Sequence, residues 1–320
     1  MPQGGRSRVE YLDASASPVF DDSLSLDALN EPVEASDAAS SETAESRARQ
    51  SHRFFCWLLG EPKPSNADAS SLPLPAEAIA RLLEKIDVVI ASEPLRAALL
   101  PRAPHVVPQL MKTLRDESYS AADVASRISK DVVLTTEVIR SAASARKRPD
   151  DEGEIDLVWA VAAIGTQGLR RAIANVVLKP MFDARGSSLS ARAGSRIWKD
   201  ADRKARLCTA LATQHGLDPL DGYLVGLLHD TGWTALLRAI DNCADISFSV
   251  GDLTHPDVVA LLLRRRDALF GAIVEPWNLS AAINGVAEEL GRAGIDAAQS
   301  PLGIALRQAD QRAAREALKD

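Results

Sequence analysis

Apolar residues recur three or four positions apart along most of this chain, and that spacing places them on one face of an α-helix. Ile197, Ala201, Ala205, Cys208 and Ala212 form one such stripe. Further stripes occupy residues 79–90, 106–114, 134–139, 157–164, 169–177, 236–240, 258–262 and 302–318. No segment alternates apolar and polar residues as a half-buried strand does. The sequence therefore predicts an all-α protein.

The N-terminal part of the chain differs in composition from the rest. Residues 1–50 are rich in Ser, Ala, Asp and Glu and have no sustained period. Residues 1–70 carry most of the chain's net charge of −7. A segment of this kind buries too little apolar surface to offset the entropy of ordering it. We therefore expect residues 1–70 to form a disordered acidic arm.

One short apolar segment, residues 54–59, interrupts this arm. Its large side chains are those of Phe54, Phe55, Trp57, Leu58 and Leu59. Such groups are costly to leave in water, so we expect a short helix that docks on its own domain. A groove on a partner protein and a membrane surface are the alternatives. If the arm is separate from the core, deleting residues 1–70 leaves the thermal unfolding midpoint nearly unchanged.

Several classes of protein do not fit the sequence. The first thirty residues contain no apolar core of a signal peptide, and no run approaches the roughly 20 apolar residues that span a bilayer. The three cysteines are far apart and lack zinc-site spacing, which is typical of reduced thiols in the cytoplasm. The pI of about 5.4 argues against a general nucleic-acid binder. We expect a cytoplasmic protein without a membrane span, and nucleic acid as an unlikely partner.

An adjacent histidine and aspartate, His229 and Asp230, form the strongest local candidate for chemistry. Imidazole and carboxylate can bind one metal ion together and lower the pKa of its bound water. A hydrolytic centre also needs further ligands and open coordination positions. The other histidines lie in the arm, among prolines or at helix ends, where surface or capping roles are expected.

The surroundings of this pair resemble the HDOD domain, a divergent relative of the HD and HD-GYP phosphohydrolases. The resemblance spans residues 95–312. It rests on the motifs Leu100-Pro101-Arg102-Ala103-Pro104, Val124–Asp131, Ala160–Gly165, Gly168-Leu169-Arg170, Trp198, Gly226–Gly232, Trp277-Asn278-Leu279-Ser280 and Ala309-Asp310. It implies an all-helical domain of the HD superfamily over these residues, a leading helix over residues 71–94 and the end of the last helix over residues 313–320.

The departures from the catalytic pattern decide what this resemblance implies. Catalytic relatives carry a histidine where this chain has Asp200, and a further His pair near residues 288–291, where it has none. His229, Asp230 and Asp310 alone match the catalytic ligands. We therefore expect a vestigial site with no bound metal and no cofactor, with Asp200 as its fourth member. Weak Mg²⁺ or Mn²⁺ binding by this oxygen-rich set is the alternative.

Basic residues form clusters at three places outside this pair. Arg264, Arg265 and Arg266 are consecutive, as are Arg170 and Arg171. Acidic residues among the basic ones favour solvated helix faces, and the same applies to a basic run from residue 192 to residue 206. A phosphate-bearing ligand or an acidic partner is the alternative for the five arginines.

The resemblance implies a function in regulation. We expect a non-catalytic bacterial signal-transduction module that acts through a protein partner of a signalling pathway or a nucleotide-type ligand. The alternative is a metal-dependent phosphohydrolase acting on a nucleotide or a cyclic dinucleotide.

Overall fold

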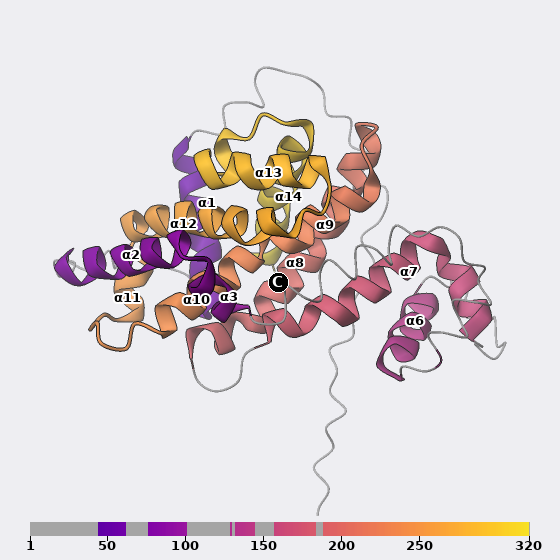
Figure 1. The fold of residues 1–320 in the computed structure, drawn as a ribbon, viewed down its shortest axis with the longest axis horizontal. Coiled ribbons are helices and arrows are strands. Elements are labelled where there is room, and N and C mark those ends of the chain that lie inside the picture. The colour runs from indigo at the N-terminus through magenta and orange to yellow at the C-terminus, as the bar shows by residue number, and fades with distance from the viewer. Residues whose placement is uncertain are drawn as a thin grey trace, which may run out of the picture. The chain divides into compact units, whose positions relative to one another are not determined.

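The computed structural model describes residues 44–61, 76–100, 129, 132–144, 157–183 and 188–319. All the regular elements among them are helices, so the all-α prediction is confirmed (Figure 1). The α-helices are α1 (Ala44–Leu59), α2 (Ala76–Ala91), α3 (Glu93–Leu99), α6 (Val132–Ser144), α7 (Leu157–Phe182), α8 (Leu189–Gln214), α9 (Pro219–His229), α10 (Thr231–Asp241), α11 (Val250–Leu253), α12 (Pro256–Val274), α13 (Ala281–Ala293) and α14 (Pro301–Ala317). Two short 3₁₀ turns, η3 (Glu275–Trp277) and η4 (Ile295–Ala297), flank α13.

Some predictions fall outside these residues. They concern the acidic arm over residues 1–43 and 62–70, the start of the leading helix over residues 71–75, the apolar stripe at residues 106–114, and most of the motifs Leu100–Pro104 and Val124–Asp131. The leading helix expected over residues 71–94 is described from Ala76 and ends at Ala91, because Pro94 lies in the first turn of the next helix, α3. Among the residues that the structure describes, no helix has both the length and the hydropathy that crossing a bilayer requires.

Helix α1 contains the apolar segment 54–59, and it packs on its own domain against α8, α12 and α14 (Figure 1). Phe54, Phe55, Leu58 and Leu59 are buried and Trp57 is half-buried. The expected disorder is therefore wrong for residues 44–53, because they form one continuous helix with the apolar segment, whose four buried side chains gather on one helical face in the core. The expected docking on the same domain is confirmed.

Arginines of α8 hold the C-terminal end of α1. Arg192 donates to the carbonyl oxygen of Leu59 at 2.8 Å, and Arg196 to that of Leu58 at 3.4 Å. These carbonyls have no partner within their own helix, and they lie at the negative end of its dipole. Arg192 also pairs with Glu61 at 3.2 Å. Two basic residues of α8 thus anchor α1.

Helices α8 and α9 form a tightly packed antiparallel pair. A Cβ atom on Gly226 of α9 would lie 2.8 Å from the Cα of Ala205 and 2.9 Å from the carbonyl oxygen of Lys204. Gly222, one turn earlier in α9, lies against Cys208 and Ala212, later in α8. This close approach places the end of α9 beside the middle of α8, which is the position of the candidate site.

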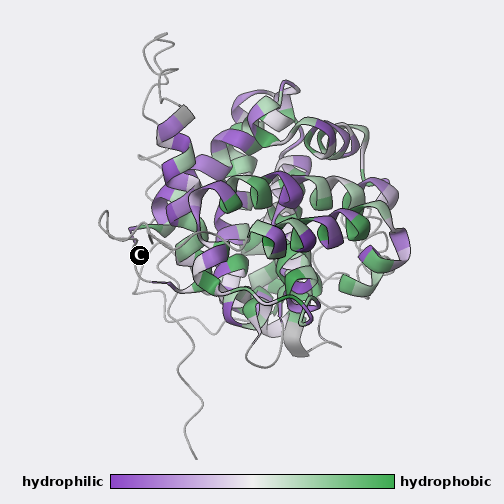
Figure 2. Ribbon diagram, turned by 90° about the vertical axis from the view of Figure 1, so that its left-hand side faces the viewer, coloured by the Kyte–Doolittle hydropathy of each residue, from purple (hydrophilic) through white to green (hydrophobic). Residues whose placement is uncertain are grey.

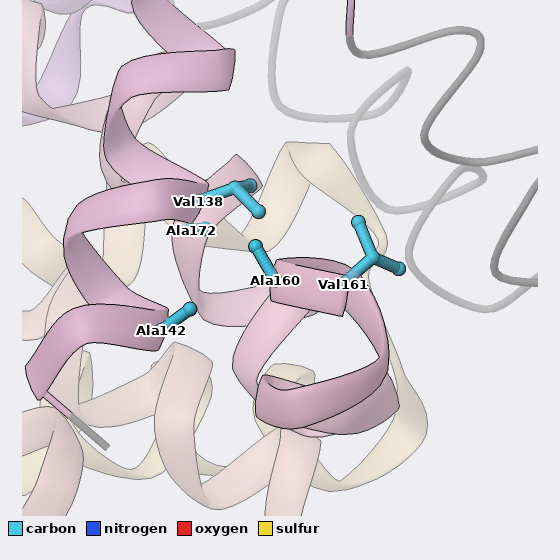
Figure 3. Close-up of a cluster of buried hydrophobic side chains, with 5 residues drawn as sticks. All are labelled: Val138, Ala142, Ala160, Val161 and Ala172. Atoms are coloured by element: carbon cyan, nitrogen blue, oxygen red, sulfur yellow. The ribbon is translucent and has the colours of Figure 1, made fainter. Parts of the chain in front are cut away.

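Helices α6 and α7 share a smaller apolar cluster (Figure 3). It contains Val138 and Ala142 of α6 with Ala160, Val161 and Ala172 of α7. Gly165 breaks α7, with φ 62° and ψ −176°, a conformation that glycine adopts without steric cost. Because of this break, both parts of α7 can contact α6.

The helices have the amphipathic character that their stripes predict. In Figure 2 the ribbons alternate between hydrophobic and hydrophilic segments along most helices. The buried side of α8 contains all five residues of the stripe from Ile197 to Ala212. Burial of such faces is the main source of helix stability in a protein of this kind.

Candidate functional site

Four helices meet at His229 and Asp230, and each contributes at least one titratable side chain. His229 ends α9, and Asp230 joins α9 to α10 with φ −77° and ψ −3°. Asp200 and Lys204 lie one turn apart in α8, and Asp310 lies in α14. Arg266 and Asp267 come from α12. We call these seven residues the charge cluster.

The side chain of Lys204 lies at the centre of the charge cluster and is completely buried. Its ammonium nitrogen is 2.6 Å from Asp230 Oδ1 and 2.7 Å from Asp310 Oδ1. The same nitrogen is 3.4 Å from Asp200 Oδ2 and 3.3 Å from His229 Nδ1. One lysine therefore contacts all four residues that the sequence predicts for the vestigial site.

The His229 ring is neutral and held on both sides. Burial lowers the pKa of His229 to about 4, and the positive charges of Arg266 and Lys204 act in the same direction. Its Nε2 lies 3.2 Å from Asp267 Oδ1, and the ring contacts Phe270 edge-on. A neutral ring has one donor and one acceptor, so Nε2 donates to Asp267 and Nδ1 accepts from Lys204. Neither nitrogen is left for another ligand.

Arg266 is the second cation of the charge cluster, and it is 3% exposed. Its guanidinium lies 2.8 Å from Asp267 Oδ1 and 3.7 Å from Asp310 Oδ2. It also lies over the ring of Trp233, 5.2 Å from the ring centre. A charge taken out of water needs close partners, and Arg266 has them on two sides.

Opposite charges set the protonation of this site. Burial alone would lower the pKa of the Lys204 ammonium, but Asp230, Asp310 and Asp200 reverse this effect and raise it. Burial would raise the pKa of Asp310, but Lys204 and Arg266 hold it well below its usual range. Lys204 and Asp310 therefore remain a charged pair at neutral pH.

Two carboxyl groups of the charge cluster, those of Asp230 and Asp200, hold their protons more strongly than a carboxyl group in water does. Burial raises the pKa of Asp230 to about 7, and it raises that of Asp200 as well, against the opposing effect of Lys204 in both cases. One oxygen of each side chain, Asp230 Oδ2 and Asp200 Oδ1, is buried and accepts no hydrogen bond. The cluster therefore contains two carboxylates that are incompletely neutralised by its two cations.

The residues of the site do not fit a divalent metal ion. Ligand atoms of His229, Asp230 and Asp310 lie within 4.8 Å of one another, which is close enough for one ion. His229 Nδ1 is 3.6 Å from Asp310 Oδ1 and 4.0 Å from Asp230 Oδ1. However, the Lys204 ammonium lies among these three atoms, so a metal ion there would meet a positive charge at contact distance.

The basic residues predicted to bind phosphate or a partner have internal contacts instead. Arg264 donates to the carbonyl oxygen of Arg292 at 3.1 Å, near the end of α13, and Arg265 pairs with Asp87 of α2 at 2.6 Å. The interpretation of residues 264–266 as one solvated face is wrong for Arg266, because it is buried in the charge cluster. Consecutive residues point about 100° apart around a helix, so these three arginines reach three different partners.

The arginines at 170 and 171 lie on α7, away from these contacts. The Arg171 guanidinium lies over the ring of Tyr223 in α9, 6.0 Å from the ring centre. Tyr223 donates to Asn175 Oδ1 at 2.8 Å. Arg171 thus contributes to the contact between α7 and α9, and its role in phosphate or partner binding stays a prediction, as does that of Arg170.

Sequence reasoning missed Lys204, because the residue stands in a basic run that predicts a solvated face. That prediction is wrong for Lys204. A signal was present in the sequence: Lys204 lies three residues after Ala201 and four before Cys208, and so falls on the buried stripe of α8. A lysine on an apolar stripe indicates an internal ion pair, and Asp200 one turn earlier is the nearest candidate.

Comparisons with known proteins found one family match and one distant curated relative. A family model described as the HDOD domain matches residues 100–289. An uncharacterized protein of Treponema pallidum (strain Nichols) is 27% identical over 139 residues, which are 42% of this chain. The match covers 25% of that relative, so this chain spans about a quarter of its length.

A solved structure with a TM-score above 0.5 shares the fold of this chain. A crystal structure from Shewanella amazonensis SB2B, named as a candidate metal-dependent phosphohydrolase, is 19% identical with a TM-score of 0.53. The likeness covers 73% of this chain and 82% of that one. An HDOD domain protein of unknown function from Geobacter sulfurreducens is 20% identical with a TM-score of 0.48, over 73% and 78% of the two chains. At such identities the likeness concerns the fold and not the reaction.

Proposed function

Because this chain belongs to the HDOD family, we propose that it is a non-catalytic regulatory module that acts by binding a partner protein of a signalling pathway. In the catalytic relatives that the family resembles, a metal ion and its bound water carry out the reaction. In this chain the side chains that could bind such an ion contact the Lys204 ammonium instead. A protein of this fold with no reaction centre can still act through its surface.

The position of the Lys204 ammonium is the observation that carries this proposal. It lies 2.6 Å and 2.7 Å from the carboxylates of Asp230 and Asp310, the two oxygen ligands expected of an active site. A positive charge there opposes the binding of a second cation and leaves no position for an activated water. Without that water, a phosphate ester bound nearby has no nucleophile.

Access to the site supports the same conclusion. The side chains of His229, Asp230 and Lys204 are completely buried, and that of Asp310 is 21% exposed. A substrate phosphate could approach Asp310 alone, and this carboxylate is negative. The arrangement favours a structural role for the charge cluster.

The alternative is the metal-dependent phosphohydrolase. The convergence of His229, Asp230 and Asp310 within 4.8 Å favours it. One nitrogen and a few carboxylate oxygens form a weak site for transition metals, although Mg²⁺ and Mn²⁺ accept such ligands. Turnover would require displacement of the Lys204 side chain from the centre of the site.

A hydrolysis assay decides between these functions. The full-length protein is incubated with bis(p-nitrophenyl) phosphate or with cyclic di-GMP, in the presence of Mn²⁺, Mg²⁺, Fe²⁺ or Zn²⁺ in turn. We expect no hydrolysis by the wild-type protein that depends on Asp230, so the Asp230→Ala variant should give the same rate as the wild type. Metal-dependent turnover in the wild-type protein, abolished in both Asp230→Ala and Asp310→Ala, would contradict the proposal and establish the enzyme.

The regulatory part of the proposal needs a positive test. Proteins cross-linked to this chain in its native cell are identified, and each is then tested for direct binding with purified components. We expect at least one partner from a signalling pathway to bind the wild-type chain. A failure of every retrieved candidate to bind the purified protein would contradict this part of the proposal.

A further inference from the structure

Lys204 stands where a bound cation would stand, and its four polar neighbours surround it as ligands surround an ion. We propose that the Lys204 ammonium is the resident cation of the charge cluster, a covalently attached replacement for a divalent metal ion. This inference deepens the proposed function and rests on it, because it gives the physical reason for the absence of metal chemistry. It also assigns a definite role to a lysine that is otherwise unexplained.

The geometry of the ammonium supports this role. Three carboxylates and one imidazole nitrogen lie between 2.6 Å and 3.4 Å from Nζ. An ammonium has three hydrogens, so this arrangement provides more acceptors than donors, as a metal ion's ligand shell would. Metal–oxygen contacts are shorter, at about 2.0–2.6 Å, so the same ligands need little movement to close on a smaller ion.

The buried acceptors without partners point to the same role. Asp200 Oδ1 and Asp230 Oδ2 accept no hydrogen bond, although both side chains are at least nine-tenths buried. One ammonium cannot satisfy every lone pair that a divalent ion with its bound water would engage. These two oxygens are left without a partner because an ammonium with one positive charge replaces a metal ion with two.

The packing of the helices explains why the lysine reaches this position. Gly226 allows α9 to lie against the backbone of α8 at Lys204 and Ala205. His229 and Asp230 follow within four residues of Gly226, at the end of the same helix. The Lys204 side chain is therefore directed between α9 and α14, where Asp310 lies.

Two variants separate the charge of Lys204 from the space it fills. Lys204→Ala removes both, and Lys204→Met removes the charge but keeps most of the volume. Lys199→Ala serves as the control, because Lys199 is exposed on the same helix. The thermal midpoint of each full-length protein is measured with EDTA, with Mn²⁺ and with propylammonium chloride. Mn²⁺ retained after desalting is counted by elemental analysis.

We expect the wild-type and Lys199→Ala midpoints to be the same in all three solutions, with no retained Mn²⁺. The Lys204→Ala midpoint falls, and Mn²⁺ or propylammonium raises it again, with stoichiometric Mn²⁺ retained. The Lys204→Met midpoint falls and neither cation restores it, because the space is filled. Recovery by an added cation is a readout that a purely steric role would not produce.

Two results would overturn the inference. One is stoichiometric Mn²⁺ in the wild-type protein that is lost in Asp230→Asn. The other is a folded Lys204→Ala protein that no cation stabilises. If Lys204→Ala does not fold, acetylation of the native wild-type protein decides: we expect Lys199 to be modified and Lys204 to be protected, and rapid modification of Lys204 contradicts its position.

The outcomes for this inference and for the proposed function are distinguishable. Wild-type protein that binds Mn²⁺ at Asp230 but hydrolyses no phosphate ester overturns the inference and leaves the proposed function unaffected. Hydrolysis that is independent of Asp230 and of added metal contradicts the proposed function and leaves the role of Lys204 intact.

Discussion

The ring of Phe55 stacks on the indole of Trp233, with 5.3 Å between the ring centres and 25° between the planes. Trp233 lies three residues after Asp230, and the Arg266 guanidinium contacts the same indole. A helix that precedes the family match is therefore connected to the charge cluster through one aromatic side chain.

Truncation of the Phe55 side chain is expected to destabilise the fold. Phe55→Ala removes a completely buried ring and should lower the free energy of unfolding by about 3–5 kcal/mol. Arg53→Ala, on the exposed side of α1, should change it by about 0.5 kcal/mol or less. Urea unfolding followed by circular dichroism measures both. Equal stabilities would mean that α1 is not part of the core.

Deletion of the N-terminal residues tests the same helix as a unit. The sequence alone predicts no effect of removing residues 1–70, but the burial of Phe54, Phe55, Leu58 and Leu59 reverses that prediction. Removal of residues 1–61 should lower the thermal midpoint markedly, because it exposes the surface that these side chains cover. An unchanged midpoint in calorimetry would restore the original expectation.

The three consecutive arginines of α12 should differ sharply in importance. Arg266→Ala removes the cation that lies 2.8 Å from Asp267 and leaves this buried carboxylate without an opposite charge in contact, which costs about 3–5 kcal/mol. Arg264→Ala removes one exposed hydrogen bond to Arg292 and should cost about 1 kcal/mol or less. Chemical denaturation of the two variants makes the comparison. Similar losses for both would show that the charge cluster contributes little to stability.

Two glycines provide a matched test of helix packing. Gly226→Ala places a methyl group 2.8 Å from the Cα of Ala205, and such overpacking costs about 1–3 kcal/mol. Gly285→Ala in α13 meets nothing within 4 Å and should stabilise the helix by about 0.5–1 kcal/mol. Opposite shifts of the thermal midpoint are expected. A tolerated Gly226→Ala would mean that α8 and α9 can separate without loss of stability.

Protonation of His229 and protonation of Asp230 should have opposite effects on the free energy of unfolding. His229 takes up a proton near pH 6.5 in the unfolded chain but near pH 4 in the folded one, so acidification over this range favours unfolding. Asp230 is protonated near pH 7 in the folded chain and near pH 3.8 in the unfolded one, so the same acidification favours folding. The wild-type stability is therefore expected to change little between pH 6.5 and pH 4.

Variants of these two residues separate the contributions. In Asp230→Asn the stability should fall on acidification, by at most about 1.4 kcal/mol per pH unit, because the opposing effect of Asp230 is removed. In His229→Gln the stability should rise on acidification, because Asp230 and Asp200, whose pKa is also raised, then act without the opposing effect of His229. Asp267 and Asp310, whose pKa values are lowered, titrate below this range. Parallel profiles of all three proteins would contradict this account.

Much of the fold could be predicted from the sequence, because helical periodicity is a local property. The stripe of α8 from Ile197 to Ala212 is buried, as the pattern predicts. Residues 54–59 show the limit of the method. Their apolar character predicted docking, but the polar residues before them concealed a helix that begins at Ala44.

The candidate site was predictable in part. The adjacent pair His229 and Asp230 is visible in the sequence, and Asp310 follows from the resemblance to the HDOD family. The role of Lys204 was not predicted, because the partners of a buried charge come from helices that are distant in sequence. Burial and pairing depend on tertiary packing, and a run of basic residues predicts neither.

The position of α1 determines where a working fragment of this protein can begin. A fragment cut at residue 100, where the family match starts, would lack α1 and leave Trp233 and its apolar neighbours in contact with water. Exposed patches of this kind promote self-association. Binding measurements on such a fragment would report non-specific association through this exposed apolar surface. The shortest suitable polypeptide therefore starts no later than residue 44.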